Sequence, residues 1–285
     1  MTMAITPSLV RDLRERTGAG MMDCKRALEE TSGDLEQAID FLRKKGLKSA
    51  EKKADREMGE GRVFSKLTAD GRVGSMIAIT CETDFVSRTP DFETMITQLT
   101  DHIEKHGPKT TEEMLGQTFE PTGTSVEEAV KQTIGKLGEN IQIARVQRLE
   151  NPEGQVGTYV HHNQKVGVLV SVTTSKSGDE ASDALKSLCM HAAAMKPTVA
   201  RREDVPSEDL EREKAIYLEE VKNKPAEMQE KIVNGKVERY YADSVFAEQA
   251  WFKDEKGKQK VSEAVTEMLG DGSRIEAFAR FQVGG

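Results

Sequence analysis

The chain has 285 residues, of which 36% are hydrophobic and 32% charged, and its formal net charge at pH 7 is −8. This length suits two or three compact domains of about 100–150 residues each, with enough apolar residues for buried cores. The acidic balance argues against a protein that mainly binds nucleic-acid phosphates, because counterion release requires clustered Lys and Arg.

The cysteines and the hydropathy pattern exclude two further classes. Cys24, Cys81 and Cys189 lie far apart without a Cys-x-x-Cys pair, which is typical of reduced thiols and not of a disulfide framework or a zinc site. The N-terminal segment has no apolar signal region, and no run approaches the roughly 20 apolar residues of a membrane span. We therefore expect a cytoplasmic protein that does not bind membranes.

Residues 5–46 predict three short helices. Thr6 can cap the first helix with Pro7 in its first turn, Asp34 can cap the third, and Gly46 suits its C-terminal end. The positions expected on their buried faces are Leu9, Val10, Leu13, Met22, Ala27, Leu28, Leu35, Ala38, Ile39 and Leu42. A unit of this size is near the lower limit for independent folding and is usually a recognition module.

A strand–turn–strand–helix pattern then occurs twice. In the first copy, GRVFSKLT and VGSMIAITC flank an Asp-Gly turn and precede a helix over residues 91–107. In the second copy, GQVGTYVHH and KVGVLVSVTT precede a helix that stops at Pro197. Aligning Val73-Gly74 with Val166-Gly167 matches the two copies, which indicates two related subdomains of antiparallel sheet and covering helix.

The remaining segments complete these subdomains. Residues 107–124 predict a loop, and Ser125 with Glu128 fits a capping box that opens a helix before the strand IQIARVQRL. Near the C-terminus, VSEAVTEML predicts a helix and RIEAFARFQV a closing strand.

Residues 206–243 differ from the rest of the chain in their pattern of charged and apolar residues. Two charged helices broken at Lys224-Pro225 predict an antiparallel helical hairpin. Its apolar stripe is thin, so we expect it to protrude from the body. The side chains expected to face each other are Leu210, Ile216, Tyr217 and Val221 with Met228, Ile232, Val237 and Tyr240.

The predicted fold class is therefore α+β, with a small N-terminal three-helix domain, a duplicated antiparallel-sheet-plus-helix core and a protruding antiparallel helical hairpin. The predicted boundaries are 1–46 for the three-helix domain, 47–60 for a linker, 61–149 for the first core subdomain, 150–205 with 244–285 for the second, and 206–243 for the hairpin.

No catalytic constellation emerges from the motifs. The chain lacks GxxxxGK[ST], a GxGxxG after a strand and GxSxG, so we predict no catalytic residue, no cofactor and no metal. His102 and His106 have ligand-capable spacing but no evident third ligand, and an exposed helix end is the simpler interpretation. His161 and His162 fall at a hairpin tip, on alternating strand faces. His191 lies in an apolar helix and is interpreted as a core-edge histidine.

Two short motifs are unusual for purely structural segments. Thr83-Asp84-Phe85-Val86 places a large ring and a carboxylate in a connection after a buried strand, where functional residues often lie. From the pattern alone, packing of Phe85 on its own hairpin is the simpler interpretation. Met21 and Met22 either fill the small core or form an adaptable recognition surface.

The chain resembles the bacterial elongation factor Ts family, the nucleotide-exchange factors of elongation factor Tu. The motifs that carry the resemblance are LVRDLRERTGAGMMDCKRALEET, GDLEQAIDFLRKKG, TDFV at 83–86, LGENIQIARV at 137–146 and CMHAAAMKP at 189–197. They cover nearly the whole chain, in order. The resemblance implies a three-helix domain like ubiquitin-associated domains, a duplicated two-subdomain core and a helical hairpin.

The resemblance also assigns roles to residues. It implies that the Thr83–Val86 segment enters the partner GTPase, that Phe85 wedges between partner helices and that Asp84 makes polar contacts, so that the Mg²⁺ is dislocated and GDP leaves. The other contact positions that it implies are Met21, Met22, Lys25, Leu137, Gly138 and His161, with His162 as the alternative to His161. The chain itself would bind no nucleotide, and its complex with elongation factor Tu could be a dimer of heterodimers.

Two other classes of function stay open at this stage. A ribosome or nucleic-acid binder would use the basic stretches near Arg11–Arg16 and Lys44–Lys53, although the acidic total favours solvated helix faces. An enzyme would use the five histidines or Cys81.

Overall fold

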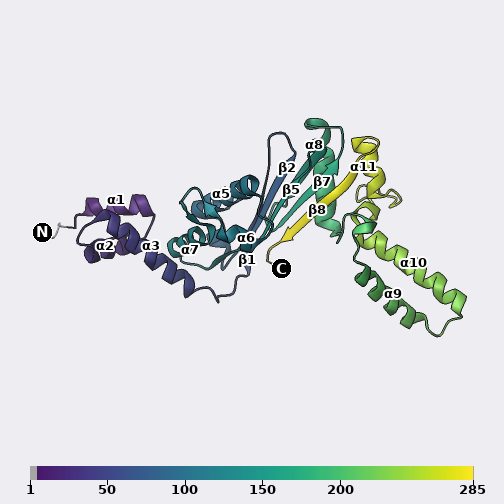
Figure 1. Ribbon diagram of the computed structural model, residues 1–285, viewed down its shortest axis with the longest axis horizontal. Coiled ribbons are helices and arrows are strands. Elements are labelled where there is room, and N and C mark those ends of the chain that lie inside the picture. Colours follow the sequence, from purple (N-terminus) through teal and green to yellow (C-terminus); the bar gives the residue numbers. More distant parts are fainter. Residues whose placement is uncertain (1–4, 285) are drawn as a thin grey trace. The chain divides into compact units, whose positions relative to one another are not determined.

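The computed structural model describes residues 5–284 and has an α+β fold (Figure 1). The chain divides into two compact units. The first runs as far as Phe64 and continues over Ile77–Val146, and the second combines Ser65–Met76 with Gln147–Gln282. No helix within residues 5–284 is both long and apolar enough to cross a membrane. The domain scheme drawn from the sequence stays a prediction.

Three helices open the first unit: α1 (Pro7–Thr17), α2 (Met21–Glu30) and α3 (Leu35–Glu51). The predicted caps are confirmed, because the backbone N–H of Leu9 donates to Thr6 and that of Gln37 donates to Asp34. The buried residues that these helices share are Val10, Leu13, Cys24, Ala27, Leu28 and Ala38.

Two predictions for this segment are wrong. Met22 is not in the core, since 68% of its surface is exposed. The third helix does not end at Gly46 but continues to Glu51. Gly46 is not a C-cap but lies inside α3, where this helix packs against the helix over Val126–Leu137. The approach is close because Gly135 has no Cβ, which would lie 2.6 Å from Cα of Gly46.

The first sheet has the strand order β1-β2-β5, formed by β1 (Glu60–Leu67), β2 (Val73–Cys81) and β5 (Ile141–Glu150). Between β2 and β5 the chain forms α4 (Asp84–Ser87), α5 (Pro90–His106), α6 (Thr111–Gly116), β3 (Thr118–Phe119), β4 (Thr124–Ser125) and α7 (Val126–Leu137). The loop predicted over residues 107–124 thus contains the helix α6 and part of a two-stranded ribbon.

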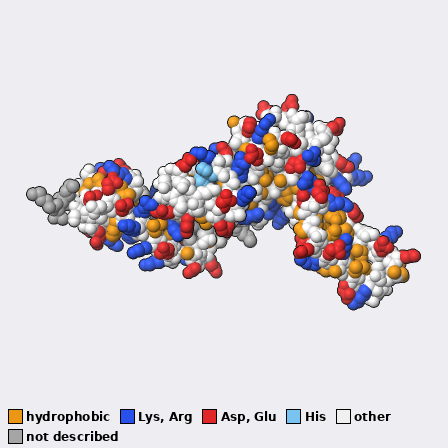
Figure 2. All heavy atoms as spheres, in the orientation of Figure 1, with side chains coloured by type: hydrophobic (Ala, Val, Ile, Leu, Met, Phe, Trp, Pro, Cys, Tyr) orange, Lys and Arg blue, Asp and Glu red, His pale blue; other side chains and the backbone are white. Residues whose placement is uncertain are grey.

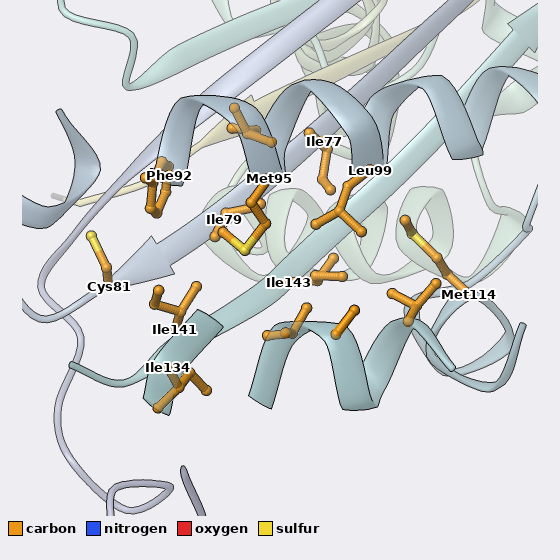
Figure 3. Packing of buried hydrophobic residues seen from close by; sticks show 14 of the residues in the cluster. Ile77, Ile79, Cys81, Phe92, Met95, Leu99, Met114, Ile134, Ile141 and Ile143 are labelled. Carbon is orange, nitrogen blue, oxygen red and sulfur yellow. The ribbon is translucent and has the colours of Figure 1, made fainter. Parts of the chain in front are cut away.

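The core of the first unit lies between these helices and strands. Figure 3 shows Phe92, Met95 and Leu99 pointing from α5 toward Ile77 and Ile79 of β2. All five side chains are buried, which confirms the stripe predicted for α5. The sequence pattern of β2, nearly all apolar, matches a strand that is buried on both faces.

The second sheet repeats the arrangement of the first, with the order β6-β7-β8. Its elements are β6 (Gly154–Val160), β7 (Val166–Thr173), α8 (Asp179–Met195), α11 (Val261–Leu269) and β8 (Arg274–Gln282). Strand β7 pairs antiparallel with both β6 and β8, with a register shift at Ser171/Val172 in the β8 pairing. Helix α8 packs on β6 and β7, so the predicted duplication is confirmed at the level of elements.

The helical hairpin consists of α9 (Ser207–Val221) and α10 (Ala226–Ser244), flanked by the 3-10 turns η1 (Arg202–Asp204) and η2 (Phe246–Glu248). Its seam contains Leu210, Tyr217, Val221, Ile232, Val233, Val237 and Tyr241. Ile216 and Met228, which were expected in the seam, are about half exposed, and Tyr241 takes the place predicted for Tyr240. Figure 2 shows hydrophobic side chains on the surface of this arm.

Candidate functional site

The connection between β2 and α5 carries a single helical turn, α4. Thr83 is its N-cap in extended conformation, and the backbone N–H of Val86 donates to the Thr83 hydroxyl over 3.4 Å. Thr89 then caps α5 by accepting from the backbone N–H of Phe92 over 3.3 Å, with Pro90 in the first turn. Two caps in close succession turn the chain sharply and present α4 at the surface.

The side chains of α4 divide between the core and solvent. Val86 is 8% exposed and belongs to the core of the unit, whereas Phe85 is 80% exposed. Asp84 forms an i,i+4 ion pair with Arg88 over 3.0 Å, with both side chains open to water. The interpretation that Phe85 packs on its own hairpin is therefore wrong. An aromatic ring with this exposure beside charged groups is typical of a binding surface.

The chain bend after α7 lies beside this turn. Leu137 ends α7 half-buried against the core, and Gly138 follows as an exposed C-cap with φ of 85°. Glu139, the next residue, accepts hydrogen bonds from the backbone N–H and the hydroxyl of Thr83. Leu137 and Gly138 thus directly precede the residue that binds Thr83.

Cys81 lies directly before this connection but has no nucleophilic character. It is fully buried, and its thiol donates to the carbonyl of Thr83 over 3.1 Å. Burial, reinforced by the negative charges of Glu139 and Glu60, raises the pKa of Cys81 to about 11. The thiol therefore stays protonated at neutral pH, which makes Cys81 a structural donor.

The predicted contact positions in α2 are also at the surface. Met21 and Met22 are 55% and 68% exposed in the first turn, which excludes core filling. Lys25 lies one turn further along the helix and forms an exposed ion pair with Glu29 at 3.8 Å. Two adjacent flexible thioethers next to a cation form an adaptable patch.

His161 belongs to the other compact unit. It follows β6, and its Nδ1 lies 2.7 Å from the hydroxyl oxygen of Tyr159. Because β6 ends at Val160, His161 and His162 lie in the turn, and their ring centroids are 4.2 Å apart. The alternation of strand faces expected from the sequence does not apply to them. His161 is half-buried and His162 exposed.

Two of the other histidines, His191 and His102, are buried, whereas His106 is exposed. His191 is fully buried as expected, ring-stacked with Phe246 and Trp251, and its Nε2 lies 3.0 Å from Oε1 of Gln249. His102 was expected at an exposed helix end, but it is buried beside Gln117. Burial lowers the pKa of both imidazoles. Within residues 5–284, no group of three or more His, Cys, Asp or Glu side chains is placed to hold a metal ion.

The fold and the site together define a duplicated α+β scaffold that exposes one aromatic ring and two methionines. The family model described as Elongation factor TS matches residues 82–285. An elongation factor Ts from Trichlorobacter lovleyi is 41% identical over 99% of this chain and 93% of its own length, and one from Aquifex aeolicus is 40% identical over the full length of both. The chain therefore belongs to the elongation factor Ts family, a family of translation elongation factors in protein biosynthesis.

The polar residues that surround α4 were not predicted from the sequence. Glu82, Glu139 and Asn140 connect two loops, and Arg62 donates to the carbonyl of Ser87 at the end of α4. Glu139 and Asn140 belong to the motif that carried the family resemblance, directly after a predicted helix end. A charged residue following a C-capping glycine was the available signal.

Proposed function

We propose that this chain binds the GTPase elongation factor Tu in its GDP-bound form and promotes release of GDP, so that GTP can bind. Membership of the elongation factor Ts family supports the partner. The observation that carries the proposal is the exposure of Phe85, 80% of whose surface is open although the neighbouring Val86 is in the core. Exposing a ring of that size is unfavourable in water unless a partner covers it.

The proposed action is mechanical. Phe85 enters between helices of the partner, and Asp84 exchanges its exposed ion pair with Arg88 for polar contacts on the partner. That pair costs little to break, because an exposed i,i+4 pair contributes only about 0.3–0.5 kcal/mol. Insertion displaces the partner's segment that holds Mg²⁺. Since Mg²⁺ neutralises much of the phosphate charge, its loss weakens the hold on GDP.

Exchange of this kind requires no covalent step, so the chain acts as a binding protein and not as an enzyme. It binds the nucleotide-free GTPase more tightly than the loaded one, and by linkage nucleotide weakens its binding by the same ratio. GTP then fills the empty site and expels the factor. The chain itself needs no nucleotide site for this cycle.

Further contacts extend the interface. We assign Met21, Met22 and Lys25 of α2 to the GTPase domain of the partner, together with Leu137 and Gly138. His161 forms a contact from the second unit, and the hairpin α9–α10 a further one. Light scattering of the purified complex distinguishes a heterodimer from a dimer of heterodimers by its mass.

The test is stopped-flow release of a fluorescent GDP analogue from elongation factor Tu. Wild type should accelerate release at substoichiometric concentrations, and Phe85→Ala should lose about 30-fold or more of that acceleration, as expected for a central aromatic anchor. Met195→Ala, which truncates an exposed methionine of α8 outside the proposed surface, serves as the matched control. Equal release by wild type and Phe85→Ala would remove the wedge from the mechanism.

A further inference from the structure

The loop before α4 and the loop after α7 are joined by reciprocal hydrogen bonds. Glu139 accepts from the backbone N–H of Thr83 at 3.0 Å through one carboxylate oxygen and from the Thr83 hydroxyl at 2.8 Å through the other. In the opposite direction, Glu82 accepts from the backbone N–H of Asn140 at 2.6 Å. Each loop therefore offers a carboxylate to the backbone of the other, and such charge-assisted bonds are strong and directional.

Helix α4 depends on these contacts for its orientation. It has four residues, too few to be stable as an isolated helix. The Thr83 hydroxyl donates its hydrogen to Glu139 and accepts from the N–H of Val86. The hydroxyl hydrogen therefore points toward the carboxylate, and a lone pair of the hydroxyl oxygen points toward the helix. A hydroxyl that donates to a charged acceptor becomes a better acceptor itself. Glu139 thus fixes both the position and the polarity of the N-cap.

The backbone on both sides of Glu139 is also held in place. Asn140 is 1% exposed, and its side-chain amide donates to the carbonyls of Ala54 and Arg56 at 3.1 and 3.3 Å. Gly138 turns the chain with φ of 85°, a conformation that glycine adopts without strain. The carboxylate is therefore attached to a backbone held on both sides, as a positioning group requires.

The far end of α4 has a separate restraint. The guanidinium of Arg62, which is buried and paired with Glu93, donates to the carbonyl of Ser87 at 3.1 Å. Between the two restraints, Val86 packs into the core and Phe85 points away from it. The ring of Phe85 is 80% exposed, so its direction depends mainly on the backbone that Glu139 and Arg62 hold.

We propose that Glu139 is a positioning residue for nucleotide exchange: it acts through Thr83 and α4 to hold Phe85 in the orientation that the partner accepts. The proposal rests on the exchange function proposed above and adds a residue that needs no contact with the partner. Without the carboxylate, α4 adopts several orientations, and only the fraction of molecules with the correct orientation binds the partner. The apparent affinity falls by that fraction, while the rate at saturating factor is kept.

The experiment is a double-mutant cycle on GDP release, measured against factor concentration. Glu139→Ala should raise the half-saturating concentration about tenfold with less than a twofold change in the saturating rate. In the Phe85→Ala background the same substitution should change the half-saturating concentration less than about twofold, since the ring that it orients is gone. Equal effects in both backgrounds, or no effect of Glu139→Ala on wild type, would overturn the proposal.

Conservative variants separate positioning from general destabilisation. Thr83→Ala loses the hydroxyl and should raise the half-saturating concentration about threefold, whereas Thr83→Ser keeps both donors to Glu139 and should raise it less. Glu120→Ala removes an exposed carboxylate paired with Lys105 in the same unit and should change nothing. A loss with Thr83→Ser as large as with Thr83→Ala would contradict the hydrogen-bond argument.

Amide hydrogen exchange of the free protein tests the same idea without the partner. Residues 84–88 should exchange about tenfold faster in Glu139→Ala than in wild type, while α5 is unchanged. Absence of accelerated GDP release by wild type would refute the exchange function, yet faster exchange of α4 would still establish the restraint. Unchanged protection of α4, with wild-type release intact, would refute the positioning role alone.

Discussion

In each sheet the first two strands are followed by a 17-residue helix, α5 in the first copy and α8 in the second, but the connections differ. Residues 82–89 form the first connection and contain α4, whereas the second consists of residues 174–178 alone. The second is a short polar loop in which Thr174 donates to the carbonyl of Leu269 and Gly178 leads straight into α8. The duplicated scaffold thus tolerates two connections of different length.

This difference separates scaffold from function. The helices and strands that recur in both copies bury their apolar residues in one core per unit. The residues added in the first copy contribute a ring to the surface and a network of polar contacts that holds it. A connection on a rigid scaffold can change without disturbing the core beneath it, which is why binding residues often lie there.

The sharpest way to break this comparison is to truncate two phenylalanines seven positions apart. Phe92 of α5 is fully buried, and Phe92→Ala should lower the free energy of unfolding by about 3–5 kcal/mol. Phe85→Ala should change it by less than about 0.5 kcal/mol, because a ring that is 80% exposed has little packing to lose. Urea unfolding measures both. A large loss of stability for Phe85→Ala would assign the ring to the scaffold.

The next effect concerns the packing of α3 against α7. A Cβ on Gly135 would lie 2.6 Å from Cα of Gly46, so Gly135→Ala forces two backbones apart and should cost about 1–3 kcal/mol. A Cβ on Gly46 meets only an ordinary contact at 3.7 Å, so Gly46→Ala should be tolerated. Thermal unfolding of both variants checks this asymmetry. Equal stability of the pair would mean that α3 and α7 do not approach so closely in solution.

Periodicity and capping predicted most of the scaffold. The stripe of α5, the break at Pro225 and the caps Thr6 and Asp34 all follow from local rules, because the residues that decide them are close in sequence. Gly46 misled the prediction, since its partner Gly135 lies in a helix far along the chain. Contacts of this kind cannot be read from a local window.

The candidate site was predicted in part. The residues of α4 and the methionines of α2 were singled out, and both are exposed, but the pattern alone favoured a packed Phe85. The hydrophobicity of a ring favours its burial, but it does not determine the direction in which a turn places the ring. Glu139 was missed because its hydrogen bonds to Thr83 join segments 56 residues apart.

A smaller effect tests the second copy through pH. His191 is buried and its pKa is lowered, so its neutral form stabilises the fold above the unfolded-state pKa of about 6.5. This contribution is lost as the pH falls below that value toward the lower folded-state pKa. Between pH 7.5 and 5.5, His191→Gln should therefore lose about 1 kcal/mol less stability than wild type.

Urea unfolding at several pH values measures this slope. Met195→Ala, on the exposed face of the same helix, should keep the wild-type dependence. Identical slopes for wild type and His191→Gln would show that the imidazole is not held neutral by burial, and that the stacked rings around it open readily.

The smallest effect contrasts the hairpin with the packed helices. Gly235 lies inside α10 and is exposed, and a Cβ added there meets nothing within 4 Å. Gly235→Ala should therefore stabilise the hairpin by about 0.5–1 kcal/mol, because alanine loses less backbone entropy in a helix. The expected change in stability is opposite in sign to that for Gly135→Ala, although both glycines lie in helices. Circular dichroism during heating measures both changes, and destabilisation by Gly235→Ala would place that face of α10 against another part of the molecule.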